Sequence, residues 1–267
     1  MKLFEFGGSL TKKQNTIAGV VGGTLLLLLW FLFTAAGVIN PMILPNPIKV
    51  MQSIPGLFVN NNLLGNIGYT VGLNLLGYLL ALVVAIPLGF VIGIYPVPSG
   101  MFKPYLEAVR YLPLPTVSGI FITIFGLGFG MKAEFLAFGI FIFTLPSIVQ
   151  KITDLQNPKN VLDNVYLQTA KTLGMSNWQT FKFVYWPYVM DRIYGDIRSL
   201  VAISYTYVVI AECLNKEGGI GALISTFTRQ ARTPEIYALL FIIVGIGIFQ
   251  DWVFKKLDPV FFPHHRR

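Results

Sequence analysis

Charged residues are scarce in this sequence. Asp, Glu, Lys and Arg make up 12% of its 267 residues, against roughly a quarter in soluble domains. Hydrophobic residues make up 54%, so the chain lacks the polar surface that keeps a domain in solution. This composition excludes an ordinary soluble protein and predicts an integral membrane protein.

The residues that build disulfides, metal sites and nucleotide sites are also few. The one cysteine, Cys213, lies in an apolar run and excludes an internal disulfide, and no Cys or His pair has metal-ligand spacing. His264 and His265 belong to a terminal HHRR, which we interpret as a solvated tail. No glycine-rich turn ends in Lys-Ser or Lys-Thr, so the chain is not expected to hydrolyse ATP. The carboxylates are too scattered for a general acid and base pair, which disfavours a membrane enzyme.

Long apolar segments predict six membrane spans, since about 20 apolar residues cross the hydrocarbon core. The first has 23 residues without a charge, and a signal peptide is the alternative because basic residues precede it. The fourth has only 15 strongly apolar residues and must either borrow length from its flanks or be partly shielded by protein. The predicted spans are residues 17–39, 67–94, 113–131, 135–149, 199–214 and 235–254.

The 20 Lys and Arg residues are unevenly distributed between these spans. With the N-terminus in the cytoplasm, 15 of them lie on the inner side, and the positive-inside rule therefore places both termini in the cytoplasm. The same bias accounts for the net charge of +8, so neither nucleic acid nor an anionic ligand is inferred from it. The five on the outer side are Lys49, Lys132, Lys216, Arg229 and Arg232.

This topology divides the chain into a cytoplasmic segment (residues 1–16), a transmembrane domain (residues 17–254) and a cytoplasmic tail (residues 255–267). Residues 40–66 are expected to form an external loop with a short amphipathic helix near residues 50–58. Residues 95–110, which are rich in proline and carry Lys103, Glu107 and Arg110, are expected to form a connecting loop.

Residues 160–188 form the longest interval that suits regular structure but not a membrane interior. They predict two short helices joined by a tight turn: Gly174 stops the first helix, Ser176 and Gln179 have the spacing of a capping box that starts the second, and Pro187 marks its end. The apolar faces are Leu162, Val165, Tyr166, Thr169 and Leu173 on the first helix and Trp178, Phe181 and Tyr185 on the second.

A motif within this hairpin carries a family resemblance. The order is Gln168-Thr169-Ala170, three residues, Gly174, nine residues, then Val184-Tyr185-Trp186-Pro187. It resembles the cytoplasmic signature of the permease subunits of binding-protein-dependent ABC importers, which runs Glu-Ala-Ala, three residues, Gly, nine residues, then Ile, any residue, Leu-Pro. The spacing, the second Ala, the Gly and the Pro match, whereas Gln168, Thr169 and Trp186 depart. Gln168 cannot form an ion pair as the family's acid does, but its amide can hydrogen-bond.

A second segment narrows the resemblance. The order Ala211-Glu212, Gly219-Ile220-Gly221, Leu223-Ile224 is similar to the nitrate, sulfonate and taurine class of these permeases. The resemblance implies an all-α integral membrane protein of the type I importer permease fold, with six transmembrane helices, cytoplasmic termini and a cytoplasmic coupling-helix hairpin, in the bacterial inner membrane.

The resemblance also implies partners and a cargo. It implies a homodimer of this subunit, two copies of an ABC ATPase that hold the ATP and Mg²⁺, and an external or periplasmic substrate-binding protein. The substrate would be a small anion such as nitrate, a sulfonate, taurine or bicarbonate. The residues implied to couple to the ATPase are Gln168, Thr169, Ala170, Lys171, Thr172, Leu173, Gly174, Met175, Ser176, Trp178 and Pro187. A hairpin lying on lipid headgroups is the alternative, because Trp178 and Tyr185 also suit an interface.

Polar residues within the spans are candidates for lining a translocation pathway: Asn74 and Tyr78 on the second span, and Tyr205, Tyr207 and Glu212 on the fifth. The alternative for the first four is bonding or packing between neighbouring helices. For Glu212, the favoured interpretation is a hydrated carboxylate at the external interface, near Lys216.

Two other functional classes remain to be compared with an ATP-driven permease. A secondary transporter driven by an ion gradient would place ionisable residues at mid-depth and would show an inverted repeat, and neither is evident in the sequence. A structural membrane scaffold would not co-purify with an ATPase.

Overall fold

A computed structural model describes residues 10–214 and 217–261 of the chain, and all regular structure in these residues is helical. Within these described residues, five helices are long and apolar enough to cross a membrane, or six if one bent helix pair counts as a single span. The predicted all-α membrane fold is therefore confirmed. The expectations for Lys2, Lys216 and the HHRR tail concern residues outside the described ones.

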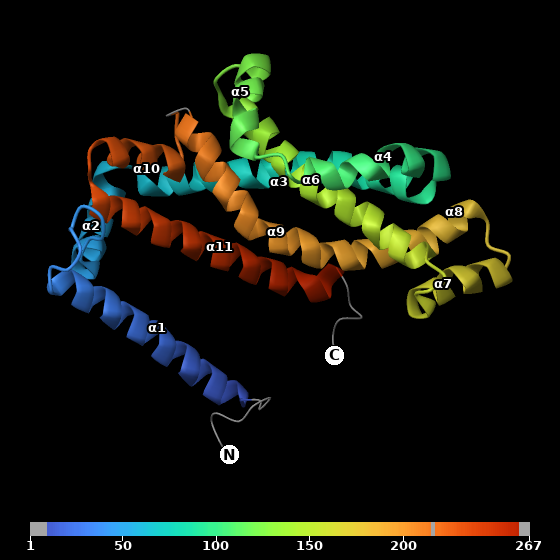
Figure 1. Cartoon of the computed structure of the whole chain (residues 1–267), viewed down its shortest axis with the longest axis horizontal. Coiled ribbons are helices and arrows are strands. Elements are labelled where there is room, and N and C mark those ends of the chain that lie inside the picture. Colours follow the sequence, from blue (N-terminus) through green and yellow to red (C-terminus); the bar gives the residue numbers. More distant parts are fainter. Residues whose placement is uncertain (1–9, 215–216, 262–267) are drawn as a thin grey trace. The chain divides into compact units, whose positions relative to one another are not determined.

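The helices are α1 (Lys12–Ala35), α2 (Pro47–Asn60), α3 (Leu63–Ile94), α4 (Pro96–Val109), α5 (Leu114–Phe125), α6 (Phe129–Gln156), α7 (Val161–Thr172), α8 (Asn177–Thr180), a π-helical turn (Phe181–Tyr185), α9 (Trp186–Leu214), α10 (Ile220–Arg229) and α11 (Thr233–Phe261) (Figure 1). They belong to two compact units, one of Met1–Asn62 with Thr226–Phe241 and a larger one of Leu63–Ser225 with Ile242–Arg267.

In the smaller unit, polar and aromatic contacts join the end of α1 and the following loop to the start of α11. The Trp30 indole N–H donates to the Pro45 carbonyl oxygen at 3.0 Å, and its ring stacks on Phe241 with a centroid distance of 5.7 Å. The Tyr237 hydroxyl donates to the Ile43 carbonyl oxygen at 3.0 Å. The short helix expected near residues 50–58 is present as α2.

The core of the larger unit lies between α3, α6 and α9, which run side by side (Figure 1). The α3 backbone approaches α6 so closely that a Cβ atom at Gly89 or Gly93 would lie within 2.6 Å of Ile148 or Ile152 side-chain atoms. Small residues at such positions allow membrane helices to pack closely, because lipid provides no hydrophobic drive for association. This packing fixes the spans to which the candidate site is attached.

The fourth predicted span lengthens into α6, which has 28 residues instead of 15. At about 1.5 Å per residue this is enough to cross the hydrocarbon core, so the expectation of borrowed length is confirmed. The extra length takes in Lys132, which was predicted to lie in a short outer loop. Lys132 is instead fully buried within α6, with its ammonium donating to the Tyr69 hydroxyl at 3.2 Å.

The third predicted span is wrong as a straight helix, and so is the loop predicted before it. Residues 96–109 form α4, and α5 has only 12 residues, about 18 Å. The two helices meet at a bend of 110°, so this region is a bent helix pair rather than one straight span. The prolines misled the prediction: Pro96 occupies the first turn of α4, where no N–H is needed, and Pro104 is tolerated further along the helix.

Candidate functional site

The turn of the predicted hairpin has the geometry that its sequence indicates. Helix α7 ends at Thr172, and Gly174 adopts a left-handed conformation with φ of 65°. The Gly174 N–H donates to the Lys171 carbonyl oxygen and the Met175 N–H to that of Ala170, both at 3.0 Å. These two bonds form a Schellman motif, which satisfies carbonyl groups at the helix end. The hairpin therefore has a rigid turn.

The second arm of the hairpin begins as predicted and continues further than predicted. The capping box is confirmed: the Gln179 N–H donates to the Ser176 hydroxyl at 3.3 Å, and the Ser176 N–H to the Gln179 amide oxygen at 2.8 Å. The predicted end at Pro187 is wrong, because residues 177–214 form one continuous helical stretch. A π-helical turn explains why the helix continues. The Trp186 N–H donates to the carbonyl oxygen of Phe181, five residues back. The backbone hydrogen-bond pattern therefore changes just before Pro187, which has no N–H to donate.

This continuity ties the hairpin directly to a membrane span. Helix α9 has 29 residues, about 44 Å, so its first part extends beyond a hydrocarbon core about 30 Å thick. Asp191, Arg192, Asp196 and Arg198 lie on that part of the helix. Figure 1 shows the hairpin at the ends of α6 and α9. The hairpin is therefore continuous with a helix of the core.

A polar clamp holds α7 against these helix ends. An Arg192 guanidinium nitrogen lies 2.8 Å from an Asp163 carboxylate oxygen, and the guanidinium carbon lies 3.6 Å from the centroid of the Tyr188 ring. The buried Asn164 amide donates to the carbonyl oxygens of Leu155 and Gln156 at the end of α6, each at 3.2 Å. Sequence reasoning missed this clamp, because its members are far apart in the chain and only the fold brings them together.

The side of the hairpin that faces away from the clamp carries exposed apolar residues. Leu162 is 84% exposed, Leu173 70% and Trp178 69%. Exposed apolar area of this kind marks an interaction surface. Ala170 is the exception among the predicted coupling residues: it is 2% exposed, so it packs inside the chain and cannot contact a partner directly. The other predicted coupling residues that are at least partly accessible are Gln168, Thr169, Lys171, Thr172, Leu173, Gly174, Met175, Ser176, Trp178 and Pro187.

Breaking the clamp is expected to uncouple the hairpin from the spans. If the hairpin couples to an ATPase, as the family resemblance implies, Arg192→Gln should lower ATP-driven transport roughly tenfold, which corresponds to about 1.4 kcal/mol of coupling free energy, because it removes the ion pair and the cation–π contact. The ATPase should still bind, since the exposed side of the hairpin is untouched. Lys255→Gln, which breaks the ion pair with Asp251, is the matched control. The double variant with Asp163→Arg and Arg192→Asp, in which the two charges are exchanged, should restore transport. Full transport activity in Arg192→Gln would contradict this role of the clamp.

The predicted pathway residues lie in four separate places. Asn74 and Tyr205 are buried and lie near each other, and the Tyr205 hydroxyl donates to the Gln250 amide oxygen at 2.5 Å. Among the described residues, the Asn74 amide has no hydrogen-bond partner. Gln250 was not predicted, although it is a polar residue within an apolar span. This polar cluster joins α3, α9 and α11 inside the core.

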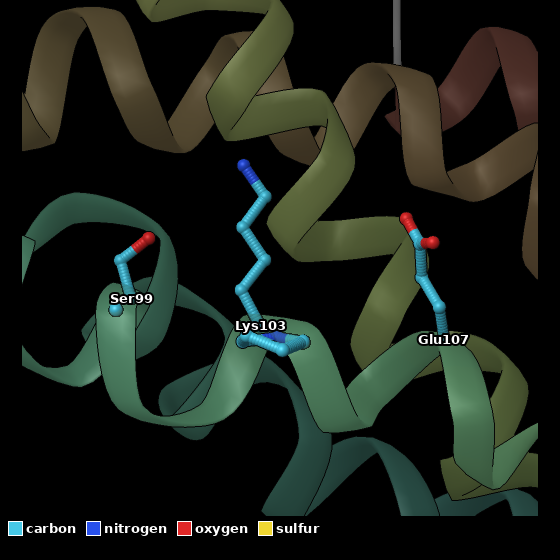
Figure 2. Close-up of a pocket in the computed structure, with 5 residues that line it drawn as sticks. Ser99, Lys103 and Glu107 are labelled. Carbon is cyan, nitrogen blue, oxygen red and sulfur yellow. The ribbon is translucent and has the colours of Figure 1, made fainter.

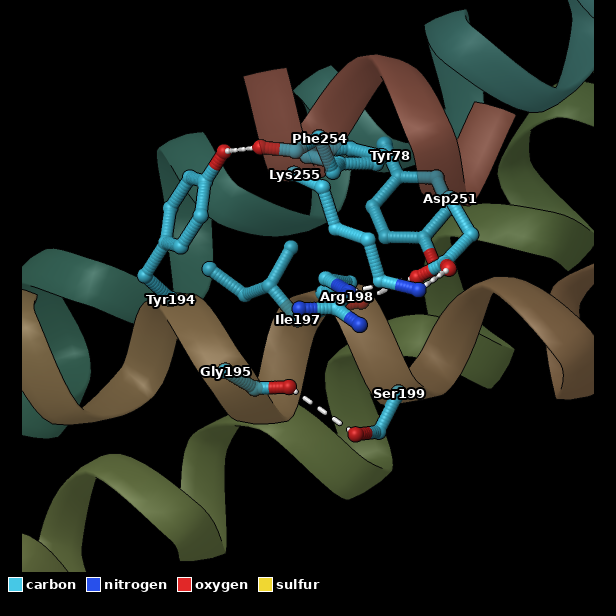
Figure 3. A network of polar contacts seen from close by, with 9 residues as sticks. All are labelled: Tyr78, Tyr194, Gly195, Ile197, Arg198, Ser199, Asp251, Phe254 and Lys255. Atoms are coloured by element: carbon cyan, nitrogen blue, oxygen red, sulfur yellow. Dashed lines mark hydrogen bonds and ion pairs between the residues drawn. The ribbon is translucent and has the colours of Figure 1, made fainter. Parts of the chain in front are cut away.

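Tyr78 belongs to a second group nearer the hairpin end of α9 (Figure 3). Its hydroxyl donates to the Ile197 carbonyl oxygen at 3.4 Å. Beside it, Arg198 forms an ion pair with Asp251, which also lies 2.8 Å from the Lys255 ammonium. The Tyr78 bond joins α3 to α9, and the Arg198–Asp251 ion pair joins α9 to α11, whereas the Lys255–Asp251 pair lies within α11.

Tyr207 does not share a face with Tyr205, as a common polar path would require. Residues two positions apart on a helix point in nearly opposite directions. Tyr207 packs beside Leu114 and next to Gly139 of α6. Its role within the chain is packing between α5, α6 and α9.

Glu212 lies in the fourth place, and the prediction that it is hydrated is wrong. The residue is fully buried. Its carboxylate accepts from the Thr70 hydroxyl and from the Gly221 N–H, both at 2.7 Å. Thr70 in turn accepts from the Ile220 N–H at 2.9 Å. Glu212 therefore binds the start of α10 to α3 within its own subunit, at the end of α9 opposite the hairpin.

In the ranges that the structure describes, no group of three His, Cys, Asp or Glu side chains is placed to hold a metal ion. The arrangement instead presents an exposed hairpin, clamped to core helices that contain buried polar clusters.

Comparison with known proteins identifies the family. The chain belongs to the binding-protein-dependent transport system inner membrane component family, whose family profile matches residues 85–262. It is therefore an inner-membrane ABC transporter permease, and the resemblance inferred from the hairpin signature is confirmed.

Three relatives cover most of the chain. A probable ABC transporter permease of Brucella melitensis biotype 1 is 25% identical over 86% of this chain and 89% of its own length. A protein of Bacillus subtilis (strain 168), provisionally named as the aliphatic sulfonates transport permease SsuC, is 22% identical over 92% and 87%. The taurine transport system permease TauC of Escherichia coli (strain K12) is 23% identical over 91% and 88%. These names agree with the sulfonate and taurine class.

Proposed function

We propose that this chain is the permease subunit of an importer, in which it forms the translocation pathway and couples it to ATP hydrolysis by a separate ATPase. The observation that carries this proposal is the hairpin: its outward side is apolar and exposed, while its inward side is clamped to α6 and α9. An ATPase that grips the exposed side would move the spans, because α9 continues from the hairpin without a break.

The assembly that follows has two copies of this subunit, two ATPase subunits that bind ATP and Mg²⁺, and an external or periplasmic substrate-binding protein. ATP binding would bring the two hairpins together. The pathway at the interface between the two permeases would then change the side of the membrane to which it is open. The hairpin then lies in the cytoplasm with residues 1–16 and 255–267, and residues 17–254 form the transmembrane domain.

The proposed cargo is a small anion or a sulfonate such as taurine. Support comes from the names of relatives, two of which are tied to sulfonates or taurine. The buried polar cluster of Asn74, Tyr205 and Gln250 lies within one subunit, and we propose that it holds the helices in register while the pathway opens beside them.

Co-purification and transport test this proposal together. The chain, expressed with its ATPase and its binding protein, is expected to purify with the ATPase and to transport only with ATP. Trp178→Ala should reduce the ATPase retained by the complex, because exposed tryptophans often dominate interface energies. Trp252→Ala, which removes an exposed tryptophan outside the hairpin, is the control and should retain it.

The contrary outcomes are distinct. Transport without nucleotide would reject the ATP-driven mechanism. A Trp178→Ala complex that keeps its ATPase but loses membrane attachment of the hairpin would favour a hairpin that lies on lipid.

A further inference from the structure

The segment predicted as a loop before the third span is helix α4, and its polar residues form a row. Ser99, Lys103, Glu107 and Arg110 follow one another at spacings of four, four and three, which places them on one side of the helix. The row covers about 16 Å of the helix axis. Its regularity distinguishes it from scattered loop charges.

This row lines a hollow surface, which we call the α4 groove. One part, of about 330 Å³, is lined by Ser99, Lys103 and Glu107 (Figure 2). An adjoining part, of about 60 Å³, is lined by Lys103, Glu107, Arg110 and, from α6, Pro146 and Gln150. Figure 2 shows the Lys103 and Glu107 side chains extended next to each other toward α6, without turning to meet.

The α4 groove lies near the hairpin end of α6. The Lys103 ammonium donates to the Thr153 hydroxyl at 3.1 Å, three residues before α6 ends at Gln156. Arg110 and Pro146 line the same hollow, and Pro146 lies seven residues before Thr153, about 10 Å further from the hairpin end of α6. If the hairpin is cytoplasmic, as the proposed function requires, the groove opens in the inner part of the membrane, where cargo leaves the pathway.

The charges in the α4 groove do not neutralise one another. Glu107 has the helical spacing for an ion pair with Lys103 or Arg110, yet in the described part of the chain neither ion pair forms. Lys103 is partly exposed, and Glu107 and Arg110 are exposed, so these charged groups are open to a solute rather than paired inside the chain. Two cations and one carboxylate are thus left for a ligand that carries the opposite charges.

We propose that the α4 groove binds the cargo and that the cargo is a small zwitterion, with an oxyanion group held by Arg110 and Lys103 and an ammonium group held by Glu107. This inference rests on the proposed function and narrows its substrate class. A guanidinium matches two oxygens of a sulfonate or carboxylate at once. An anion without an amine would leave Glu107 unpaired and repelled, which selects against it.

A phosphatidylethanolamine headgroup carries the same pair of charges, so the test must separate a solute from a lipid. The complex of permease and ATPase, without its binding protein, is placed in nanodiscs of phosphatidylcholine and phosphatidylglycerol. Equilibrium binding of radiolabelled taurine is measured, with ethanesulfonate as the competitor that lacks the amine. Bound phosphatidylethanolamine is measured separately after purification from cells.

The wild-type complex is expected to bind taurine and to bind ethanesulfonate at least roughly tenfold more weakly, the loss of one charge-assisted contact. Arg110→Gln should weaken both ligands by roughly tenfold or more. Glu107→Gln should weaken taurine alone, so that the two ligands bind equally. The controls, Arg229→Gln and Glu217→Gln, alter charges outside the groove and should leave both affinities unchanged.

Three results would overturn the proposal. The first is no taurine binding at roughly 10 mM, and the second is binding that Arg110→Gln and Glu107→Gln leave unchanged. The third is that the wild type retains phosphatidylethanolamine, Glu107→Gln loses it, and taurine does not bind. This result would show that the groove binds a lipid headgroup. Retention of the ATPase is measured in the same samples. If the wild-type complex retains the ATPase but does not bind taurine, only the substrate inference is wrong. If the wild-type complex loses the ATPase, the proposed function is rejected as well.

Discussion

Gly174→Arg is expected to reduce ATP-driven transport at least about tenfold, as for a residue at the centre of an interface. Gly174 has φ of 65°, a conformation that costs an ordinary residue about 1–2 kcal/mol. No atom lies within 4 Å of a Cβ placed there, so the arginine fits without a clash inside the subunit. Its long cation would instead project from the turn between the exposed Leu173 and Trp178, where the partner is proposed to bind.

The control for this variant is Gly174→Asn. Asparagine tolerates the left-handed conformation better than most residues, so it preserves the Schellman turn and adds only a short side chain. It is expected to retain most transport and most of the bound ATPase. Transport rate and ATPase retention should be measured on complexes with matched permease content. Normal transport by Gly174→Arg would show that the turn does not face the ATPase.

Glu212→Ala is expected to produce the largest loss of stability. The carboxylate is fully buried and accepts two hydrogen bonds. Its removal leaves the Gly221 N–H without its acceptor and frees the Thr70 hydroxyl, and each buried polar group left unsatisfied costs about 1–3 kcal/mol. The melting temperature of the purified permease should fall by about 5–10 °C.

The matched control is Glu217→Ala, since Glu217 is exposed and its removal should change the melting temperature little. Glu212→Gln, which keeps one acceptor oxygen, should fall between the control and Glu212→Ala. A melting temperature that is equal in Glu212→Ala and Glu217→Ala would show that the carboxylate does not secure α10 to α3.

Local sequence signals predicted the hairpin turn well. Gly174 and the Ser176–Gln179 pair act through bonds to residues at most five positions away, so their effect is written in the adjacent sequence. Pro187 was misjudged because the usual rule, that proline ends a helix, assumes an α-helical ladder. The residues at the two ends of the π-helical turn that accommodates it, Phe181 and Trp186, both pack on Phe90 of α3, a contact that the local sequence does not reveal.

The predicted pathway residues show the limit of single-sequence reasoning. The sequence identified the polar residues within apolar spans as unusual, but it did not predict which neighbours each of them contacts. Glu212 was assigned to water because it lies near the end of a span. The structure gives it two partners, Thr70 and Gly221, of which the first is 142 positions away in the chain. No sequence signal joins residues at that separation.

Composition and short-range pattern were enough to establish a multi-span helical membrane protein with a glycine-turn hairpin, because apolar length and helix-end hydrogen bonds are properties of contiguous residues. Only the tertiary structure decided that the hairpin continues into α9 and is clamped by Asp163 and Arg192, that Glu212 is buried, and that α4 carries a charged groove. Each of these depends on free energies of packing and pairing between distant segments, which exist only once the helices have met.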